Sequence, residues 1–491
     1  MTTSALAASR RFVAENGWRV LADFRDLLRM PNVTRDAAHL RVNADELVRR
    51  FEKRGATMEV VELPGASPAV IGELTSPGAT YTLGVYVHYD GQPVDPTKWT
   101  VDPFAATLVG NALHLGGQEI TSDPGPGDEI DPEWRIYARG ASDDKTPFAA
   151  ITAALDSLDA AGIDRTVNLV FLFEGEEESG SPNLSRYMEA HADRLRADAW
   201  LLCDGPVHQT RKPQVVFGVR GYTGFDLTVY GPERELHSGH YGNWVPNPAF
   251  ELARLLAGCK DANGRVTIEG FYDDTIPMTN ADRAAIAALP PVEQQLPDEL
   301  GFGGSEVSDA LYVERLMIPS FNVRGLRSAS VGEEARNVIP TEATASVDIR
   351  LAAGDDPVVM LDRVEAHLEK QGYHVLDRPP TPEERRAHPR LAWLKKMPGY
   401  RAARIPMDSP LARTLLSACE TAGGEVVAMP TLGGSVPLHL FEELLGAPVV
   451  VLPIANHDNN QHGADENVRV ANIWYGIDLW ATLLTTEFPS G

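Results

Sequence analysis

Cysteine is scarce in this chain of 491 residues, which has only Cys203, Cys259 and Cys419. Their wide, uneven spacing excludes a disulfide framework and a thiolate zinc site, and it favours the reducing cytoplasm. No apolar run approaches the roughly 18 residues that a membrane span needs. The amino-terminal segment MTTSALAASRRFVAENGWRVLADFRDLL also lacks the apolar centre of a signal peptide. We therefore expect a cytoplasmic protein without a membrane partner.

Positive charge is in short supply as well. The chain has 44 Lys and Arg against 69 Asp and Glu, a formal net charge of -25. This charge repels phosphate backbones, so nucleic acid is not an expected partner. With 43% hydrophobic and 23% charged residues and no fixed-period repeat, the composition is that of an ordinary globular protein.

The order of apolar and amphipathic segments predicts an α/β domain that is interrupted by a second domain. Residues 1–215 alternate strand-like and helix-like segments, the pattern of a sheet covered by helices, and this pattern resumes over 398–491. Residues 216–397 contain their own strand-helix-strand-helix order, in GFDLTVYG, NPAFELARLLAGC, EATASVDIRL and DPVVMLDRVEAHLEKQG. We interpret them as an inserted α+β domain, in which residues 261–335 form long loops with short helices.

Five acidic or histidine-bearing segments follow one another along the chain. Three of them come directly after strand-like runs, in LGVYVHYD, VNLVFLFEGEEESG and AWLLCDG. Functional side chains of open α/β sheets gather at strand ends. Together the imidazole and carboxylate groups could hold two zinc ions, which predicts a hydrolase. The candidates are His88 with Asp90, Asp143 with Asp144, Glu177 with Glu178, Asp204, and His462.

Several of these residues also have ordinary structural interpretations. His88 could be a hydrogen-bonded loop histidine, and Asp143 could cap a helix or lie in a solvated turn. His88 could bind a metal through one ring nitrogen. The carboxylate of Asp90, two residues further along, could then accept a hydrogen bond from the other ring nitrogen. In the last segment His457 competes with His462, and spacing alone does not separate them.

The run EGEEESGS over residues 174–181 is the sharpest signal. Its adjacent carboxylates could belong to the first turn of a helix, where negative charge is stabilised by the helix dipole. They also repel one another unless a cation neutralises them or one of them is protonated. A hydrolytic zinc site needs one carboxylate on the metal and another free to act as a base. Glu178 and Glu177 suit these two roles.

The ordered segments HYDGQPV, RGASDDK, EGEEESGS, LLCDG, ELHSG, NVIPTEATASVDIRL, GGSVP and HGADEN resemble one known family. It is the zinc metallopeptidase family of carnosine dipeptidases, aminoacylases, acetylornithine deacetylases and succinyl-diaminopimelate desuccinylases. Asp204 is similar to the dipeptidase and aminopeptidase branch. The resemblance implies a di-zinc catalytic domain with a mixed sheet flanked by helices, interrupted by an inserted α+β, ferredoxin-like domain that acts as a lid and forms a homodimer.

The resemblance also implies a role for each residue of the centre. Asp90 orients His88, Glu177 is the general base, and a cis peptide follows Asp143. Two zinc ions per subunit are implied, with manganese or cobalt as alternatives. The implied metal ligands are His88 and Asp204 on one ion, Glu178 and His462 on the other, and Asp143 on both.

Further site residues are implied outside the centre. His237, in ELHSG, reaches into the partner's active site and stabilises the oxyanion, so that dimerisation is catalytic. Asn337 and Arg350 bind the backbone and the terminal carboxylate of the substrate. The guanidinium of Arg350 is suited to binding a carboxylate. Gly434 and Ser435 belong to a loop that contacts the substrate.

The function that these implications favour is hydrolysis of the amide bond of dipeptides or similar small peptides. Two alternatives stay open at this point. One is an N-acyl amino acid amidohydrolase with the same machinery, and the other is a non-catalytic relative that keeps the fold for binding.

Overall fold

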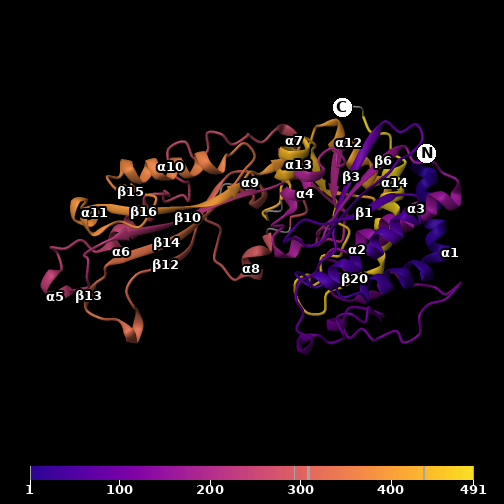
Figure 1. The fold of residues 1–491 in the computed structure, drawn as a ribbon, viewed down its shortest axis with the longest axis horizontal. Coiled ribbons are helices and arrows are strands. Elements are labelled where there is room, and N and C mark those ends of the chain that lie inside the picture. The colour runs from indigo at the N-terminus through magenta and orange to yellow at the C-terminus, as the bar shows by residue number, and fades with distance from the viewer. Residues whose placement is uncertain (1, 292–293, 307–309, 435–436, 490–491) are drawn as a thin grey trace.

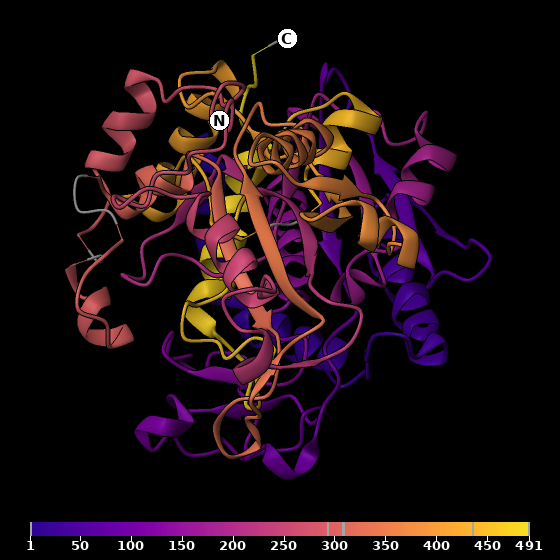
Figure 2. The ribbon, with the colours of Figure 1, turned by 90° about the vertical axis from the view of Figure 1, so that its left-hand side faces the viewer.

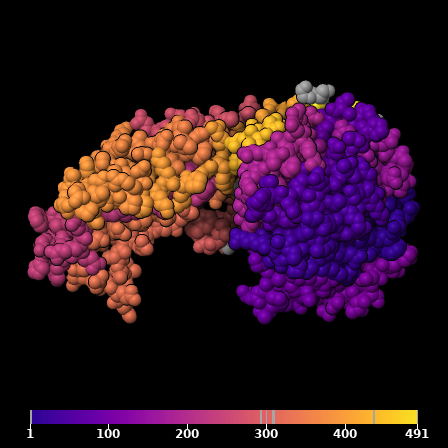
Figure 3. Space-filling model, in the orientation of Figure 1, coloured from indigo at the N-terminus to yellow at the C-terminus, as the bar shows by residue number. Residues whose placement is uncertain are grey.

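The computed structural model describes residues 2–291, 294–306, 310–434 and 437–489. These residues form an eight-stranded sheet and a separate five-stranded sheet, besides smaller ones. Figure 1 shows the two sheets in separate lobes, with both chain termini at the lobe of the larger sheet. On one side a broad hollow separates the lobes (Figure 3). The predicted fold, a mixed-sheet domain with an inserted second domain, is confirmed.

The larger sheet is mixed and has the strand order β1-β2-β6-β3-β7-β19-β8-β18. Its central strand β3 pairs in parallel with β6 on one side and β7 on the other. These three strands are almost entirely buried, as expected for strands with helices on both faces. The strands are β1 (Thr57–Val61), β2 (Ala69–Leu74), β3 (Tyr81–His88), β6 (Val167–Glu174), β7 (Ala199–Leu202), β8 (Gln214–Val216), β18 (Val427–Met429) and β19 (Val449–Val451).

Helices pack on both faces of this sheet. One face is covered by α1, α2, α3, α12 and α14, whose apolar side chains form the main core, and the other by α4 and α13. At the start of α2 the Asp36 side chain accepts from the His39 N–H, and Gly162 ends α3 with a φ of +63°. The helices are α1 (Thr2–Leu28), α2 (Ala37–Glu52), α3 (Thr146–Ala161), α4 (Leu184–His191), α12 (Pro410–Gly423), α13 (His439–Leu445) and α14 (Val470–Leu484).

The smaller sheet has the order β12-β14-β10-β16-β15 and is antiparallel except between β15 and β16. Phe225, Leu227 and Val229 of β10 join the core with α6 and α10, because alternate residues of a strand point to one face. Figure 2 looks onto this lobe. The predicted strand-helix-strand-helix order is present as β10 (Gly221–Tyr230), α6 (Pro248–Ala257), β14 (Glu342–Leu351) and α10 (Pro357–Lys370), with β12 (Ser320–Arg327), β15 (His374–Leu376) and β16 (Leu391–Tyr400) completing the sheet.

Of the five strands of the smaller sheet, the sequence predicted β10 and β14 but not β12, β15 or β16. Residues 261–335 do contain short helices, but Ser320–Arg327 forms the edge strand β12. Only Phe321 of this strand is buried, so the sequence has no alternation of apolar and polar residues to reveal it. The domain boundaries at 215 and 397 stay predictions, and the chain leaves the smaller sheet at the end of β16. Short helices here are α7 (Asn280–Ala287), α8 (Leu296–Leu300) and α9 (Tyr312–Leu316).

The remaining elements are short. β4 (Thr107–Val109), β5 (Arg135–Tyr137) and β20 (Asn467–Arg469) form one small sheet, and β9 (Gly218–Val219) pairs with β17 (Ala403–Arg404). At the outer end of the inserted lobe β11 (Leu236–His237) pairs with β13 (Val338–Ile339), next to α5 (Ser238–Tyr241), and α11 (Pro382–Ala387) precedes β16. In the described ranges no helix is both long and apolar enough to cross a membrane.

Candidate metal centre

Two groups of potential metal ligands share one residue, Asp143. Within each group the ligand atoms all lie within 4.8 Å of one another. All of these residues were predicted from the sequence as ligands, and the division into groups is the one that the family resemblance implies. The groups are His88, Asp143 and Asp204, and Asp143, Glu178 and His462.

The larger sheet brings three of these residues together. His88 is the last residue of β3, Glu178 lies in the short 3-10 helix Glu177–Ser179 after β6, and Asp204 follows β7. Because β6, β3 and β7 are adjacent and parallel, their carboxyl ends meet at one edge of the sheet. Asp143 and His462 come to this edge on loops, before α3 and after β19.

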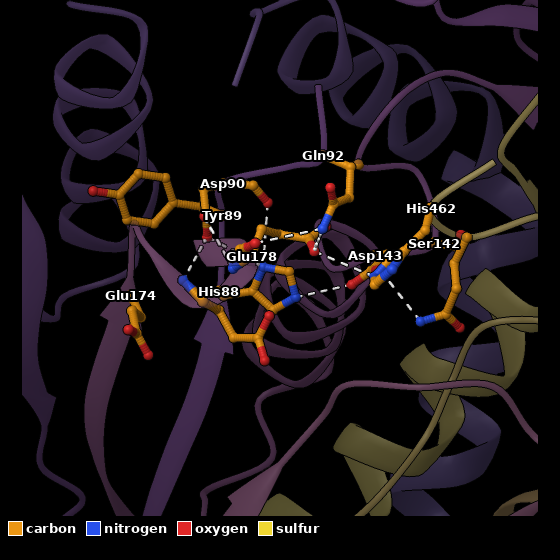
Figure 4. A network of polar contacts seen from close by, with 12 residues as sticks. His88, Tyr89, Asp90, Gln92, Ser142, Asp143, Glu174, Glu178 and His462 are labelled. Carbon is orange, nitrogen blue, oxygen red and sulfur yellow. Dashed lines mark hydrogen bonds and ion pairs between the residues drawn. The ribbon is translucent and has the colours of Figure 1, made fainter. Parts of the chain in front are cut away.

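His88 lies between two carboxylates (Figure 4). Its Nε2 is 2.9 Å from Asp143 Oδ1, and its Nδ1 is 3.4 Å from Asp90 Oδ1. Burial alone would lower the pKa of His88, but the hydrogen bonds with these two residues outweigh it and raise the pKa well above its usual value. The backbone N–H groups of Glu177 and Glu178 donate to the Asp90 carboxylate, at 3.1 and 3.2 Å. Asp90 therefore positions both the histidine and the acidic segment after β6.

His462 completes the second group. Its Nε2 is 3.1 Å from Asp143 Oδ2 and 3.2 Å from Glu178 Oε2. These contacts raise the pKa of His462 to about 10, although partial burial opposes the rise. Gln92 donates to Glu178 Oε2 from the other side, at 2.7 Å. His457, the competing histidine, is exposed and belongs to neither group.

The carboxylates of the centre fit a cation. Glu178 Oε1 and Asp204 Oδ1 are buried and have no hydrogen-bond partner among the described residues. Burial, with nearby carboxylates, raises the pKa of Asp204 to about 8. Burying an unpaired carboxylate costs free energy unless it coordinates a metal or takes up a proton. A mixed imidazole and carboxylate set suits zinc, and also manganese or cobalt.

Glu177 adjoins the second group but is a member of neither. Burial raises the pKa of its carboxyl, and the negative charge of Asp143 adds to the effect, whereas His88 opposes it. A carboxyl with a raised pKa beside a metal centre is suited to exchanging protons at neutral pH. The peptide bond between Asp143 and Asp144 is cis, as the family resemblance implies.

Glu466 was missed as a site residue. It is fully buried and accepts hydrogen bonds from the N–H groups of Gly140, Ser142 and Asp143, at 2.8 to 3.0 Å. The Arg139 guanidinium also donates to it, at 2.6 Å. Glu466 thus holds the loop that presents Asp143. A sequence signal for Glu466 was available. Arg139 and Glu466 have opposite charges, and they stand in two of the segments that carry the family resemblance, RGASDDK and HGADEN.

His237 and Asn337 lie far from the centre within one chain. The His237 Nδ1 accepts from the Gly239 N–H at the start of α5, and the Ser238 N–H donates to the Asn337 carbonyl, at 3.0 Å. Figure 1 shows α5 and β13 at the outer end of the inserted lobe. The structure therefore brings these two residues together, but not to the metal ligands of the same chain.

Arg350 and Gly434 lie nearer the junction of the lobes. Arg350 is at the end of β14, with its guanidinium carbon 5.4 Å from the centre of the Tyr222 ring and its side chain 37% exposed. The Gly434 carbonyl accepts from the Arg220 N–H, at 3.3 Å. Ser435 lies outside the described residues.

Known proteins are similar to this chain in sequence and in fold. The chain is 27% identical to the Cys-Gly metallodipeptidase dug1 of Schizosaccharomyces pombe, over 89% of this chain and 88% of the relative. It is 25% identical to the human Beta-Ala-His dipeptidase, over 92% and 85%. The crystal structure of the M20 family metallo-carboxypeptidase Sso-CP2 from Sulfolobus solfataricus superimposes with a TM-score of 0.70 and 27% identity, covering 95% of this chain and 98% of that one.

One family accounts for these likenesses. The sequence profile described as peptidase family M20/M25/M40 matches residues 84–486, well over half of the chain and all of the candidate metal ligands. The predicted resemblance is thereby confirmed, and the chain belongs to peptidase family M20/M25/M40, a family of metal-dependent peptidases.

Proposed function

We propose that the protein is a metal-dependent dipeptidase that hydrolyses the amide bond of dipeptides or similar small peptides. The observation that carries the proposal is the pair of ligand groups joined at Asp143, with Glu177 beside them. The names of the dipeptidases to which the chain is similar over most of its length support the same substrate class.

The ligand groups suggest how two divalent cations, with zinc as the first candidate, are held. His88 and Asp204 would hold one ion, Glu178 and His462 would hold the other, and Asp143 belongs to both groups. Divalent cations held there would supply Lewis-acid activation of a water molecule and of the scissile carbonyl. Asp90 fixes the ring of His88 through Nδ1, the nitrogen that faces away from Asp143.

Glu177 acts as the general base in this proposal. Its carboxylate takes a proton from the attacking water and returns it to the leaving amine. The Glu177 N–H is held by Asp90, so the same carboxylate that orients His88 also fixes the base. Raising the pKa of the Glu177 carboxyl brings it closer to neutral pH, where accepting and returning a proton are both favourable.

Substrate recognition involves both lobes. Arg350, with Gly434 and Ser435 of the neighbouring loop, binds the terminal carboxylate. His237 lies too far along the inserted lobe to serve its own centre (Figure 1). In the proposal, a second copy of the chain supplies His237 to stabilise the oxyanion and the adjacent Asn337 to bind the substrate backbone, so that the active protein is a homodimer.

The first experiment is turnover by protein that has been stripped of metal and then supplied with zinc, manganese or cobalt. Free dipeptides and the matching N-acetyl amino acids are compared at equal concentration. We expect little turnover without metal and a clear preference for the free dipeptides once metal is restored. Preference for the acetylated substrates would assign the protein to the amidohydrolases instead, and activity that survives metal removal would contradict the proposed centre.

A further inference from the structure

His237 combines a fixed backbone with an exposed side chain. Its backbone pairs with Val338 in the small sheet of β11 and β13, and the N–H of the next residue, Ser238, donates to the Asn337 carbonyl at 3.0 Å. The His237 side chain is exposed within one chain, at the outer end of the inserted lobe (Figure 1). The strand pairing therefore fixes where the side chain begins, but it does not fix the direction of the ring.

Two neighbours in the same short segment set the direction of the ring. The Gly239 N–H donates to His237 Nδ1, at 3.1 Å. The His240 ring lies beside the His237 ring, with centroids 4.7 Å apart at an interplanar angle of 43°. Both neighbours are within three residues of His237, so the arrangement is built into the segment itself.

The hydrogen bond from Gly239 determines which nitrogen of His237 can donate. A neutral imidazole has one nitrogen that donates and one that accepts. Because Nδ1 accepts from the Gly239 N–H, the neutral ring carries its proton on Nε2. An N–H donor at Nε2 is the group that the proposed oxyanion contact needs.

Gly239 also leaves space for the ring. A Cβ atom at this position would lie 3.0 Å from His237 Cε1 and 3.2 Å from His237 Nδ1, inside the roughly 3.5–4.0 Å at which non-bonded heavy atoms pack best. The φ of Gly239 lies outside the left-handed region, so its backbone conformation does not require glycine. Glycine also destabilises a helix such as α5 relative to alanine. The ring of His237, and not the fold, is therefore the group that benefits from a glycine here.

We propose that Gly239 is a positioning residue for His237. Its N–H and its lack of a side chain hold the ring with the Nε2 proton available to the oxyanion in the partner's active site. The inference rests on the proposed function, in which His237 serves a second copy of the chain. Gly239 acts only through His237, so a side chain at position 239 weakens stabilisation of the oxyanion and leaves metal and substrate binding unchanged.

The test compares Gly239→Ala and Gly239→Val in the zinc-loaded full chain, with a dipeptide as the substrate. The larger side chain displaces the ring further. We expect kcat to fall about three- to tenfold for Ala and about 10- to 100-fold for Val. KM should stay nearly unchanged, because the oxyanion forms only in the transition state. The melting temperature of Gly239→Ala should stay at or above that of the wild type.

Double variants show whether Gly239 acts through His237. In a His237→Ala background, Gly239→Val should lower kcat no further, because the ring that it displaces is absent. Mixing Gly239→Val chains with Glu177→Gln chains should restore activity, because one site of the mixed dimer then has an intact Glu177 and receives an undisturbed His237.

The matched control is the same pair of substitutions at Gly325. This glycine is exposed in the inserted lobe, its φ is also outside the left-handed region, and a Cβ atom there would meet no described atom within 4 Å. NMR of protein with 15N-labelled histidine reads the ring directly, with the His237 signals identified by their absence from His237→Ala. Nδ1 should be unprotonated in the neutral ring of the wild type, and its signal should move in Gly239→Val but not in Gly325→Val.

Several results would overturn the positioning role alone. These are a wild-type kcat in folded Gly239→Val protein, a further loss in the His237→Ala background, an equal effect of the Gly325 variants, and a protonated Nδ1 in the neutral wild-type ring. If the Val variant folds poorly, Gly239→Ala is judged by the same results. A wild type that is inactive on dipeptides would overturn the proposed function, and the NMR signals would still decide whether Gly239 holds the ring.

Discussion

Glu177 is the residue on which the proposed chemistry depends most directly. Replacing it with Gln keeps its size but removes the proton acceptor, so we expect kcat to fall by about 100-fold or more. Bound metal should be unchanged, because Glu177 is in neither ligand group. The measurements are turnover of a dipeptide and metal content by elemental analysis.

The matched control for Glu177 is its neighbour. Glu178→Gln alters a member of the second ligand group and should lose both activity and metal. Wild-type turnover by the Glu177→Gln variant would contradict its assignment as the base.

Glu174 makes the stability of the protein depend on pH. Burial raises the pKa of this carboxyl to about 8, although the hydroxyl of Tyr86 donates to it and opposes the rise. A carboxyl whose pKa is higher in the folded state stabilises the fold at low pH, and this stability is lost as the pH rises from about 4 through about 8. Urea unfolding at pH 5, 7 and 9 should show that Glu174→Gln has a flatter pH dependence than the wild type. Parallel curves would contradict the raised pKa.

At the scale of elements, the loop before α3 depends on Glu466. The buried pair that it makes with Arg139 has an N–O distance of 2.6 Å, and both side chains are at most 2% exposed. Glu466→Gln should weaken zinc binding about 10- to 100-fold, because Asp143 is no longer held in place. Competition with a chelator measures this loss. The exposed pair of Arg386 and Glu233 has the same distance, 2.6 Å, so Glu233→Gln is the control and should bind zinc normally.

At the scale of the whole molecule, the position of His237 makes a complementation experiment decisive. His237→Ala and Glu177→Gln chains should each be inactive alone. If a second chain supplies His237, a mixed dimer has one site with both residues intact, and activity should return on mixing. Light scattering would report the dimer. A fully active His237→Ala protein, or a monomer with full activity, would contradict the proposed exchange.

The sequence was sufficient for much of the site because the chemistry lies at strand ends. His88, Glu178 and Asp204 each follow an apolar run, and parallel neighbouring strands bring such residues to one edge. The edge strand β12 could not be predicted in the same way. It buries one side chain, so its formation depends on pairing with β14 and not on its own pattern of residues.

The sequence by itself determined which kinds of ligand the protein has and in what order they occur, because residue type and strand periodicity are local properties of the chain. Residue spacing did not separate His457 from His462, and the family resemblance implied His462. The tertiary structure brings His462 to Asp143 and Glu178 through the path of a loop in which His462 has a φ of +62°. The contacts of Glu466 were likewise decided by the tertiary structure. They join residues 326 positions apart in the case of Gly140 and Glu466, and no local sequence pattern records such a contact.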